Sequence, residues 1–334
     1  MPVKRVDRIH RVWLTSASIG FCLLVIGCAS QHQEPSAMDE YRLGVAAQKA
    51  NDFHGAVEHY QNAVHADPTL RMANAKLAEL YRTDGNYVLA AKQYRIAVQL
   101  DPYSADNEYY LGVCCQLLRR FQEAAVAYLH ALRLRPTDAP ASMNLGLVYM
   151  ALGQTQQADR CLQRATQLDP KSASAWLNYG VNLDSEGNHA EAESAYRRAI
   201  ELQPGSTAAL EDLAANLIAQ KKGREAIQAC EQLLLRTDSA SARTRYGQAL
   251  QITGDNSGAA KQLDIALAHD PHSSLAMSAK GFLLIKQYRE SLELDEPKRT
   301  AALDLWRQSL AINPDQPTVR QAMRQWSSPQ LLGG

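Results

Sequence analysis

Small and large apolar residues recur along the chain among polar ones, in a pattern that returns every 34 residues. Prolines mark the interval at Pro68, Pro102, Pro136, Pro170 and Pro204. Eight residues before each proline lies a bulky residue, namely Tyr60, Tyr94, Tyr128, Leu162 and Tyr196. Twenty-four residues before each lies a small one, namely Gly44, Ala78, Gly112, Gly146 and Gly180. A fixed period of this length predicts stacked supersecondary units, each of which buries its apolar face against its neighbours.

Each period predicts two packed helices. The small residue lets the two helices approach closely, and the tyrosine or leucine fills the remaining space between them. Gly85, Gly153 and Gly187 end the first helix of their repeats, where a left-handed residue is needed. The proline stops the second helix. The low aromatic content of 7% also suits close-packed helices better than sheets.

The pattern continues in altered form toward the C-terminus. Leu213-Ala214, Tyr246-Gly247 and Gly281 with Trp306 mark three further repeats. A nine-residue excess around residues 287–299 interrupts the last of them. Residues 316–326 form a final amphipathic pattern, which we interpret as a capping helix because terminal repeats need a polar outer face.

The order of a bulky residue, Leu-Gly, an aromatic, Ala, an aromatic, Ala and Pro resembles the tetratricopeptide repeat (TPR) family, over residues 37–326. The resemblance implies an all-α TPR solenoid, an α-α superhelix. We predict about eight helical hairpins at residues 37–314, then a capping helix and tail at residues 315–334. No stretch is left for a second, catalytic domain.

The N-terminus has the features of an export signal. A basic stretch to Arg11 precedes an apolar segment from Trp13 to Gly27, which is shorter than the roughly 20 residues that cross a bilayer. We therefore predict a signal peptide at residues 1–27. The end of this segment, Leu24-Val25-Ile26-Gly27-Cys28, resembles the lipobox of bacterial lipoproteins. That resemblance implies lipidation of Cys28 and cleavage after Gly27; an uncleaved signal anchor with an incidental cysteine is the alternative.

A lipid on Cys28 would place the repeat array close to a membrane. Residues 28–37 hold the lipidated cysteine and a short tether that reaches at most roughly 30 Å. Two or three acyl chains give a stable anchor. Ala29 and Ser30 lack the aspartate that retains such lipoproteins at the inner membrane. The resemblance thus implies the bacterial cell envelope and, in a host with two membranes, the periplasmic face of the outer membrane.

The composition offers little for catalysis or nucleic-acid binding. Lys+Arg and Asp+Glu balance at 35 each, so we expect no nucleic-acid partner. Cys114, Cys115, Cys161 and Cys230 are interpreted as small core residues without disulfides. His54 and His59 lie five apart, a spacing that does not share a helical face, so no metal site is expected. Phosphate loops and nucleophile elbows do not occur in the sequence. We therefore expect neither enzymatic activity nor a cofactor.

A binding groove is expected where the family has one. In TPR arrays the first helix of each hairpin lines the concave surface, and set positions of each repeat contact the ligand. In repeats three and four these positions hold the apolar strip Tyr109, Val113, Leu117, Met143, Leu147 and Met150. We expect this strip to be dispensable for packing within the hairpins and to bind a partner; the alternative is that superhelical neighbours or the N-terminal segment cover it.

Two asparagines add to the expected groove. Asn144 and Asn178 occupy the sixth position of consecutive repeats, which resembles the asparagine ladder by which some TPR proteins hold an extended peptide backbone. A solvated asparagine pair is the alternative. The lysine and asparagine set of the carboxylate-clamp TPR type is not met.

The layout of lipobox, short tether and repeat array resembles the pilotin-like lipoproteins of type IV pili and the TPR lipoproteins of Tad pilus systems. It implies a non-enzymatic scaffold for other proteins or extended peptides, anchored in the envelope and assisting assembly of a pilus or secretion machine. Two alternatives remain open. The chain could be an adaptor that docks cell-wall hydrolases or proteases, or a TPR component of polysaccharide synthesis, export or glycosyl transfer.

Overall fold

The computed structural model describes residues 35–327, and within that range all regular structure is helical. The helices in chain order are α1 (Ala37–Lys49), α2 (Phe53–Ala66), α3 (Arg71–Thr83), α4 (Tyr87–Leu100), α5 (Ala105–Leu117), α6 (Phe121–Leu134), α7 (Ala139–Ala151), α8 (Thr155–Leu168), α9 (Ala173–Ser185), α10 (His189–Leu202), α11 (Thr207–Ala219), α12 (Gly223–Leu234), α13 (Ala240–Thr253), α14 (Asn256–His269), α15 (Ser274–Glu290), α16 (Glu296–Ile312) and α17 (Pro317–Ser327). The first sixteen pair into eight hairpins, and α17 follows as a single helix. The predicted all-α solenoid of about eight hairpins with a C-terminal capping helix is confirmed.

Short polar side chains fix where most helices begin. Ser36, Ser104, Ser172 and Ser206, for example, each accept a hydrogen bond from the backbone N–H three residues later. Such N-caps satisfy a donor that the first turn of the helix leaves unpaired. The serine caps belong to first helices, and Asp138 has the same role before α7, so the entry into most hairpins is encoded locally; α3 begins after Leu70 without a side-chain cap.

The turn inside each hairpin needs a left-handed residue. Gly85, Gly153 and Gly187 have φ of 80°, 71° and 82°, which confirms the predicted role of these glycines. Repeats one, three and six place other residues at the same position and keep the conformation. These residues are Asn51, Arg119 and Lys221, with φ of 58°, 58° and 59°. The backbone turn is therefore maintained even where the side chain opposes it.

The interior of a hairpin is a close approach between one small and one large residue. A Cβ added at Gly180 would lie 2.6 Å from a ring carbon of Tyr196, and one added at Gly146 would lie 2.6 Å from Cγ of Leu162. Tyr196 and Leu162 are themselves buried. This agrees with the predicted packing of the small positions against the bulky ones.

Three buried tyrosine hydroxyls, those of Tyr60, Tyr128 and Tyr196, find a partner on the first helix of their own hairpin, twelve residues earlier. Tyr60 donates to Gln48 at 3.0 Å, and Tyr128 donates to Gln116 at 2.8 Å. Repeat four has Leu162 in place of the tyrosine, and an apolar residue, Met150, stands twelve residues before it. A buried hydroxyl needs a hydrogen-bond partner and a leucine does not. This explains why the residue twelve positions earlier is polar before a tyrosine and apolar before Leu162.

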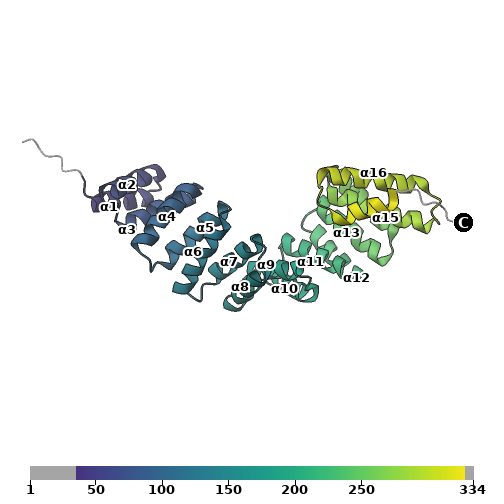
Figure 1. Cartoon of the computed structure of the whole chain (residues 1–334), viewed down its shortest axis with the longest axis horizontal. Helices are drawn as coiled ribbons and strands as arrows, with labels where there is room; N and C mark the ends of the chain where they lie inside the picture. Colours follow the sequence, from purple (N-terminus) through teal and green to yellow (C-terminus); the bar gives the residue numbers. More distant parts are fainter. Residues whose placement is uncertain (1–34, 328–334) are drawn as a thin grey trace, which may run out of the picture.

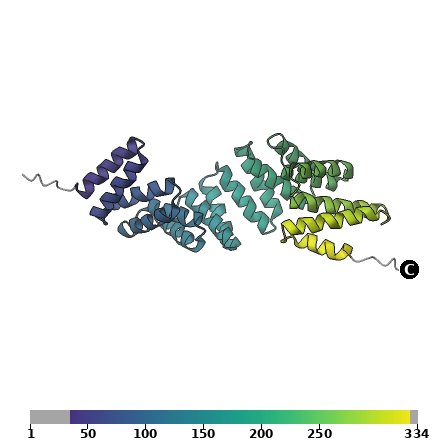
Figure 2. The same cartoon turned by 90° about the horizontal axis from the view of Figure 1, so that it is seen from above.

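Stacking of the hairpins produces a curved array. First helices of successive hairpins contact each other, as α5 does with α7 and α7 with α9, whereas the second helices of neighbouring hairpins make fewer such contacts. From α5 to α12 the first helices lie on the concave side of the bend and the second helices on the convex side (Figure 1). Seen from above, the hairpins follow one another along the long axis, with α1 at one end and α16 near the other (Figure 2).

The C-terminal hairpin is longer than the others. Its helices α15 and α16 have 17 residues each, against 13 and 14 in α5 and α6, so the excess predicted near residues 287–299 mostly lengthens the two helices. Trp306 and Trp326 are buried in its core, and α17 packs on α16. The outer side of α17 exposes the polar residues Arg320, Gln321, Arg324 and Gln325, as expected of a cap.

The predicted signal peptide (residues 1–27) and the lipidation site Cys28 lie outside the described residues. Between residues 35 and 327, no helix is both long enough and apolar enough to cross a membrane.

Candidate functional site

An apolar row runs along the concave surface. We number positions within each repeat from its first helical residue, which is Ala105 in repeat three. The ninth position is Val113 on α5, Leu147 on α7, Val181 on α9 and Ala215 on α11. We call these four residues the position-nine row. All four are half-buried, so an apolar surface continues over four successive hairpins. It extends two hairpins beyond the strip expected in repeats three and four.

The six residues of the expected apolar strip lie on α5 and α7, two neighbouring first helices. Leu117 is 52% exposed, and Met143, Leu147 and Met150 are half-buried. Tyr109 and Val113 differ from expectation because they also pack inside the hairpin. The ring of Tyr109 lies 5.8 Å from that of Tyr128, and Val113 packs on the same core cluster. The expectation that the whole strip is dispensable for packing is therefore wrong for these two residues.

The two asparagines of the expected ladder have different surroundings. The amide of Asn144 donates to the hydroxyl of Tyr109 at 3.2 Å and so links α7 to α5. Asn178 on α9 is half-buried, and within residues 35–327 its side chain makes no hydrogen bond. Asn178 therefore has its whole amide free, whereas Asn144 uses one N–H, and the ladder stays a prediction.

Beyond the apolar row, the concave surface becomes acidic. Asp184 on α9 and Glu211 and Asp212 on α11 lie close together. Burial raises the pKa of Asp212, and the neighbouring carboxylates of Glu211 and Asp184 add to the rise against the opposing effect of Arg245. Negative charge beside the row repels phosphate groups.

Asp184 also joins two hairpins. One of its carboxylate oxygens lies 2.6 Å from Nδ1 of His189 and accepts a hydrogen bond from the amide of Asn216, also at 2.6 Å. The other accepts from the hydroxyl of Tyr196 at 3.2 Å. Repeats five and six are therefore linked by polar contacts as well as by apolar packing.

The cysteines are core residues. Cys114, Cys115 and Cys230 are buried, Cys161 is half-buried, and none of these four forms a disulfide, as predicted. Burial raises the pKa of Cys114 to about 11 and that of Cys230 to about 12. A thiol with a raised pKa is a poor nucleophile at neutral pH because little thiolate forms.

The two histidines considered for a metal site, His54 and His59, have different surroundings. His54 is exposed, whereas Nδ1 of His59 lies 2.7 Å from a carboxylate oxygen of the buried Glu40. In the described part of the chain, no group of three or more His, Cys, Asp or Glu side chains could hold a metal ion.

Further hollows lie at places that the sequence reasoning missed. One of about 580 Å³ lies between α13 and α15, where Gln251, Phe282, Ile285 and Lys286 line it. Phe282 occupies the ninth position of repeat eight, so the position that marks the row could have indicated this hollow from the sequence. It places a second apolar contact point on first helices near the C-terminal end.

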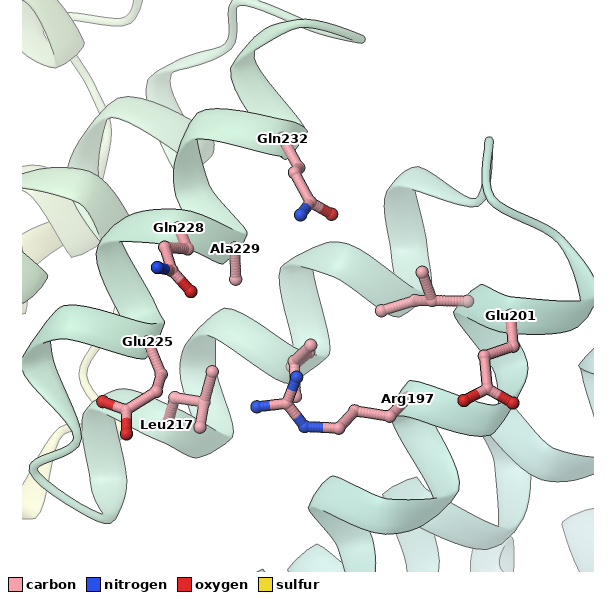
Figure 3. Close-up of a pocket in the computed structure, with 9 residues that line it drawn as sticks. Arg197, Glu201, Leu217, Glu225, Gln228, Ala229 and Gln232 are labelled. Atoms are coloured by element: carbon pink, nitrogen blue, oxygen red, sulfur yellow. The ribbon is translucent and has the colours of Figure 1, made fainter.

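Another hollow lies on the convex side, between the second helices α10 and α12. It has a volume of about 250 Å³, and Arg197 of α10 and Glu225, Gln228 and Gln232 of α12 surround it (Figure 3). Its rim is polar and charged. Nothing in the sequence reasoning addressed this outer side of the array.

Comparison with known proteins identifies the repeats. Two sequence models described as tetratricopeptide repeat match the chain, one at residues 41–105 and 143–207 and the other at residues 185–251. Together these matches cover more than half of the 334 residues. No curated protein matches the sequence.

Solved structures share the architecture. PilF of Pseudomonas aeruginosa is 22% identical over 62% of this chain and 94% of its own, with a TM-score of 0.53. A tetratricopeptide repeat protein from Parabacteroides merdae is 17% identical over 73% of this chain and 96% of its own, with a TM-score of 0.53. A chain of the APC/C hetero-tetramer Cut9–Hcn1 is 16% identical over 87% of this chain and 59% of its own, with a TM-score of 0.56. At these identities the likeness concerns the fold alone. Taken with the matched repeats and the stacked hairpins, it shows that the chain belongs to the tetratricopeptide repeat family.

Proposed function

We propose that this TPR protein is a non-enzymatic scaffold that holds other proteins in its concave groove. It is anchored through lipid on Cys28, at the periplasmic face of the outer membrane, and assists assembly of a pilus or secretion machine. The position-nine row carries the proposal. Val113, Leu147 and Val181 present half-exposed apolar side chains in register on three successive hairpins.

The spacing of the row suits an extended segment. Packed helices lie about 8–10 Å apart, and a segment in the polyproline II conformation advances about 3.1 Å per residue with three residues per turn. A bound segment in that conformation would therefore place about every third side chain against the row. Covering the exposed half of one leucine contributes about 1 kcal/mol, so several such contacts are needed for stable binding. The free amide of Asn178 can bond the segment's backbone whatever its sequence.

The anchor and the assembly role rest on other observations. The basic stretch, the short apolar segment and Cys28 support export and lipidation. The role in a pilus or secretion machine rests on the layout of lipobox, short tether and repeat array.

The binding part is tested by substitution in the groove. Leu147→Asp combined with Val181→Asp places two charges in the row, and Ser194→Asp with Gln228→Asp places two on the convex side as a matched control. We expect one component of an envelope machine to co-purify from cross-linked membranes with the wild type and the control, and to be lost with the groove variant. Equal recovery of that component with all three proteins would contradict the proposed binding surface.

The anchor is tested separately. Cys28→Ser should leave the protein without its lipid. We expect this variant to be released from the membrane fraction, whereas the wild type stays there as a cleaved lipoprotein. Mass spectrometry of the N-terminus distinguishes the outcomes. An uncut N-terminus in the wild type, with membrane attachment unchanged by the substitution, would favour the signal anchor.

A further inference from the structure

The outer side of α6 is apolar where every comparable helix is polar. The 22nd position of a repeat lies on the convex side and is exposed; in repeats one, two, four, five, six and seven it holds Glu58, Lys92, Arg160, Ser194, Gln228 and Lys261. The 25th position of the same repeats holds Gln61, Arg95, Gln163, Arg197, Glu231 and Asp264. Repeat three has Val126 and Leu129 instead, and they are 54% and 43% exposed. The other repeats show that the fold does not need apolar residues here, so their presence calls for a binding role.

A hollow adjoins Val126. It has a volume of about 410 Å³ and lies between α4 and α6, with Val98, Leu111, Val126 and Ala127 forming its apolar lining. The ion pair of Arg95 and Glu123, at 2.7 Å, lies at its rim.

The corresponding hollow between α10 and α12 provides an internal comparison. It is built from the same repeat positions, yet Gln228 stands where Val126 does and Gln232 where His130 does (Figure 3). Its volume is about 250 Å³. A third hollow at these positions, in repeat five, has a volume of about 430 Å³ and an apolar floor of Trp176, Tyr179 and Leu183, but Ser194 stands where Val126 does. What is particular to repeat three is therefore the exposed apolar pair Val126 and Leu129, and this pair does not follow from the way hairpins stack.

Positive charge predominates on the second helices in this part of the array, while Glu108 and Glu123 line the hollow itself, paired with His130 and Arg95. The second helices α4, α6 and α8 carry five basic residues against the two acids Glu123 and Asp159; the five are Lys92, Arg95, Arg133, Arg160 and Arg164. The next two second helices, α10 and α12, carry five acidic residues against three basic ones. Within the described residues, Lys92, Arg133 and Arg160 form no ion pair. Their charge is thus available to a partner.

We propose that this surface, the α6 face (Val126, Leu129 and the hollow beside Val126, with Lys92 on α4, Arg133 on α6 and Arg160 on α8), binds an acidic amphipathic helix of a partner protein. Such a helix presents apolar side chains three and four residues apart, which can enter the hollow and cover Val126 and Leu129. Its acidic residues meet the lysine and the two arginines. A flat bilayer would leave the hollow unfilled and gain only two apolar contacts. The α6 face is separate from the concave groove and does not rest on the function proposed for the groove.

The test uses the purified full chain in lipid nanodiscs and two fluorescein-labelled helical peptides. Both peptides carry leucine at i, i+3, i+4 and i+7; one has glutamate at the flanking positions and the other has lysine. Fluorescence anisotropy should show binding of the glutamate peptide that weakens as salt increases. Val126→Glu with Leu129→Glu should weaken this binding by at least about tenfold, because central apolar contacts carry most of the affinity of an interface. Ser194→Glu with Gln228→Glu, at the 22nd positions of repeats five and six, is the matched control and should leave it unchanged.

Three outcomes overturn the proposal: no binding of the glutamate peptide at millimolar concentration, equal binding of the lysine peptide, or equal binding by the double variant. Circular dichroism of the double variant should show an unchanged melting temperature, since both side chains are exposed. A bimane label on Val126→Cys, in nanodiscs containing phosphatidylglycerol, tests the bilayer. Its emission should stay that of a solvent-exposed probe until the glutamate peptide is added, and a blue shift with nanodiscs alone would assign the face to the membrane.

Discussion

The first five hairpins and the last three solve the same packing problem in different ways. In repeats one to five the period stays at 34 residues, and a small residue faces a tyrosine or leucine in every hairpin. In the last three the period varies, Asp238 stands where a proline is expected, and α12 has only 12 residues. The first helices α11, α13 and α15 also make more contacts with one another than α5, α7 and α9 do.

The last hairpin keeps the close approach of a small residue to a large one. Gly281 faces Trp306, the largest fully buried side chain, and a Cβ added there would lie 2.3 Å from the indole nitrogen. That nitrogen donates to the carbonyl of Ser278 at 3.2 Å. The pairing of one small residue with one large residue is thus kept in the last hairpin, whereas repeat six has Cys230 opposite Ala214. The lengthened helices α15 and α16 also pack Tyr288 and Trp326 into the same core.

The largest expected effect removes that ring. Trp306→Ala should lower the free energy of unfolding by about 3–5 kcal/mol, because the cavity lies in the core that holds α15, α16 and α17 together. Trp176→Ala is the control. Trp176 is half-buried, so its replacement should lower the free energy of unfolding much less. Thermal unfolding followed by circular dichroism measures both. Equal losses would show that the C-terminal core is not centred on Trp306.

A smaller loss is expected from overfilling a regular hairpin. Gly180→Leu should cost roughly 1–3 kcal/mol, because the new side chain meets the ring of Tyr196. Gly205→Leu is the matched control, as nothing lies within 4 Å of a Cβ added at Gly205. An unchanged melting temperature for Gly180→Leu would count against the register of the repeats.

Two asparagines at the tenth position of neighbouring repeats allow a comparison of two contacts between hairpins, that of repeats four and five and that of repeats five and six. Asn182 is fully buried, and neither polar atom of its side chain has a partner in the described residues, since the preceding repeat offers Met150 where the next one offers Asp184. Asn182→Leu should therefore stabilise the protein by about 1–2 kcal/mol. Asn216→Leu should destabilise it by a similar amount, because Asp184 and the carbonyl of His189 lose a donor. Urea unfolding measures the free energy of unfolding of both variants. A change of the same sign in the two variants would contradict the different roles given to the two asparagines.

The smallest effect concerns the turns. Arg119 has φ of 58°, a conformation that glycine adopts without strain, so Arg119→Gly should stabilise the protein by up to about 1 kcal/mol. Gly187→Ala, at the equivalent turn of repeat five, should destabilise it by a similar amount. Differential scanning calorimetry can resolve both shifts. A lower melting temperature for Arg119→Gly would mean that contacts of the arginine outweigh the strain.

Much of the fold follows from the sequence because the period encodes contacts within one hairpin. Gly180 and Tyr196 lie sixteen residues apart, and the turn between them fixes their distance. The glycine turns, the eight hairpins and the final capping helix could be predicted from such short-range information. The left-handed conformation of Arg119 was not predicted, because an arginine by itself gives no sign of it; the signal lay in its position, 34 residues after Gly85 and 34 before Gly153.

The candidate surfaces were less predictable, because they depend on how hairpins stack. The hydrogen bond from Asn144 to Tyr109 crosses between repeats and uses one of the amide's donors, which the sequence did not indicate. The apolar row was expected only in part, although Val181 and Ala215 sit at the same position as Val113. Predicting the outer hollows requires knowing how two second helices lie relative to each other, and periodicity alone does not give this.

Site-specific photo-crosslinking in membranes tests the central claim most directly. A benzoylphenylalanine would replace Leu147 or Val181 on the concave surface, and Ser194 or Gln228 on the convex surface. The account predicts that the two concave positions yield an adduct with one and the same protein and that the two convex positions do not. Adducts with that protein from the convex positions, or none from the concave ones, would contradict a concave groove as the binding surface.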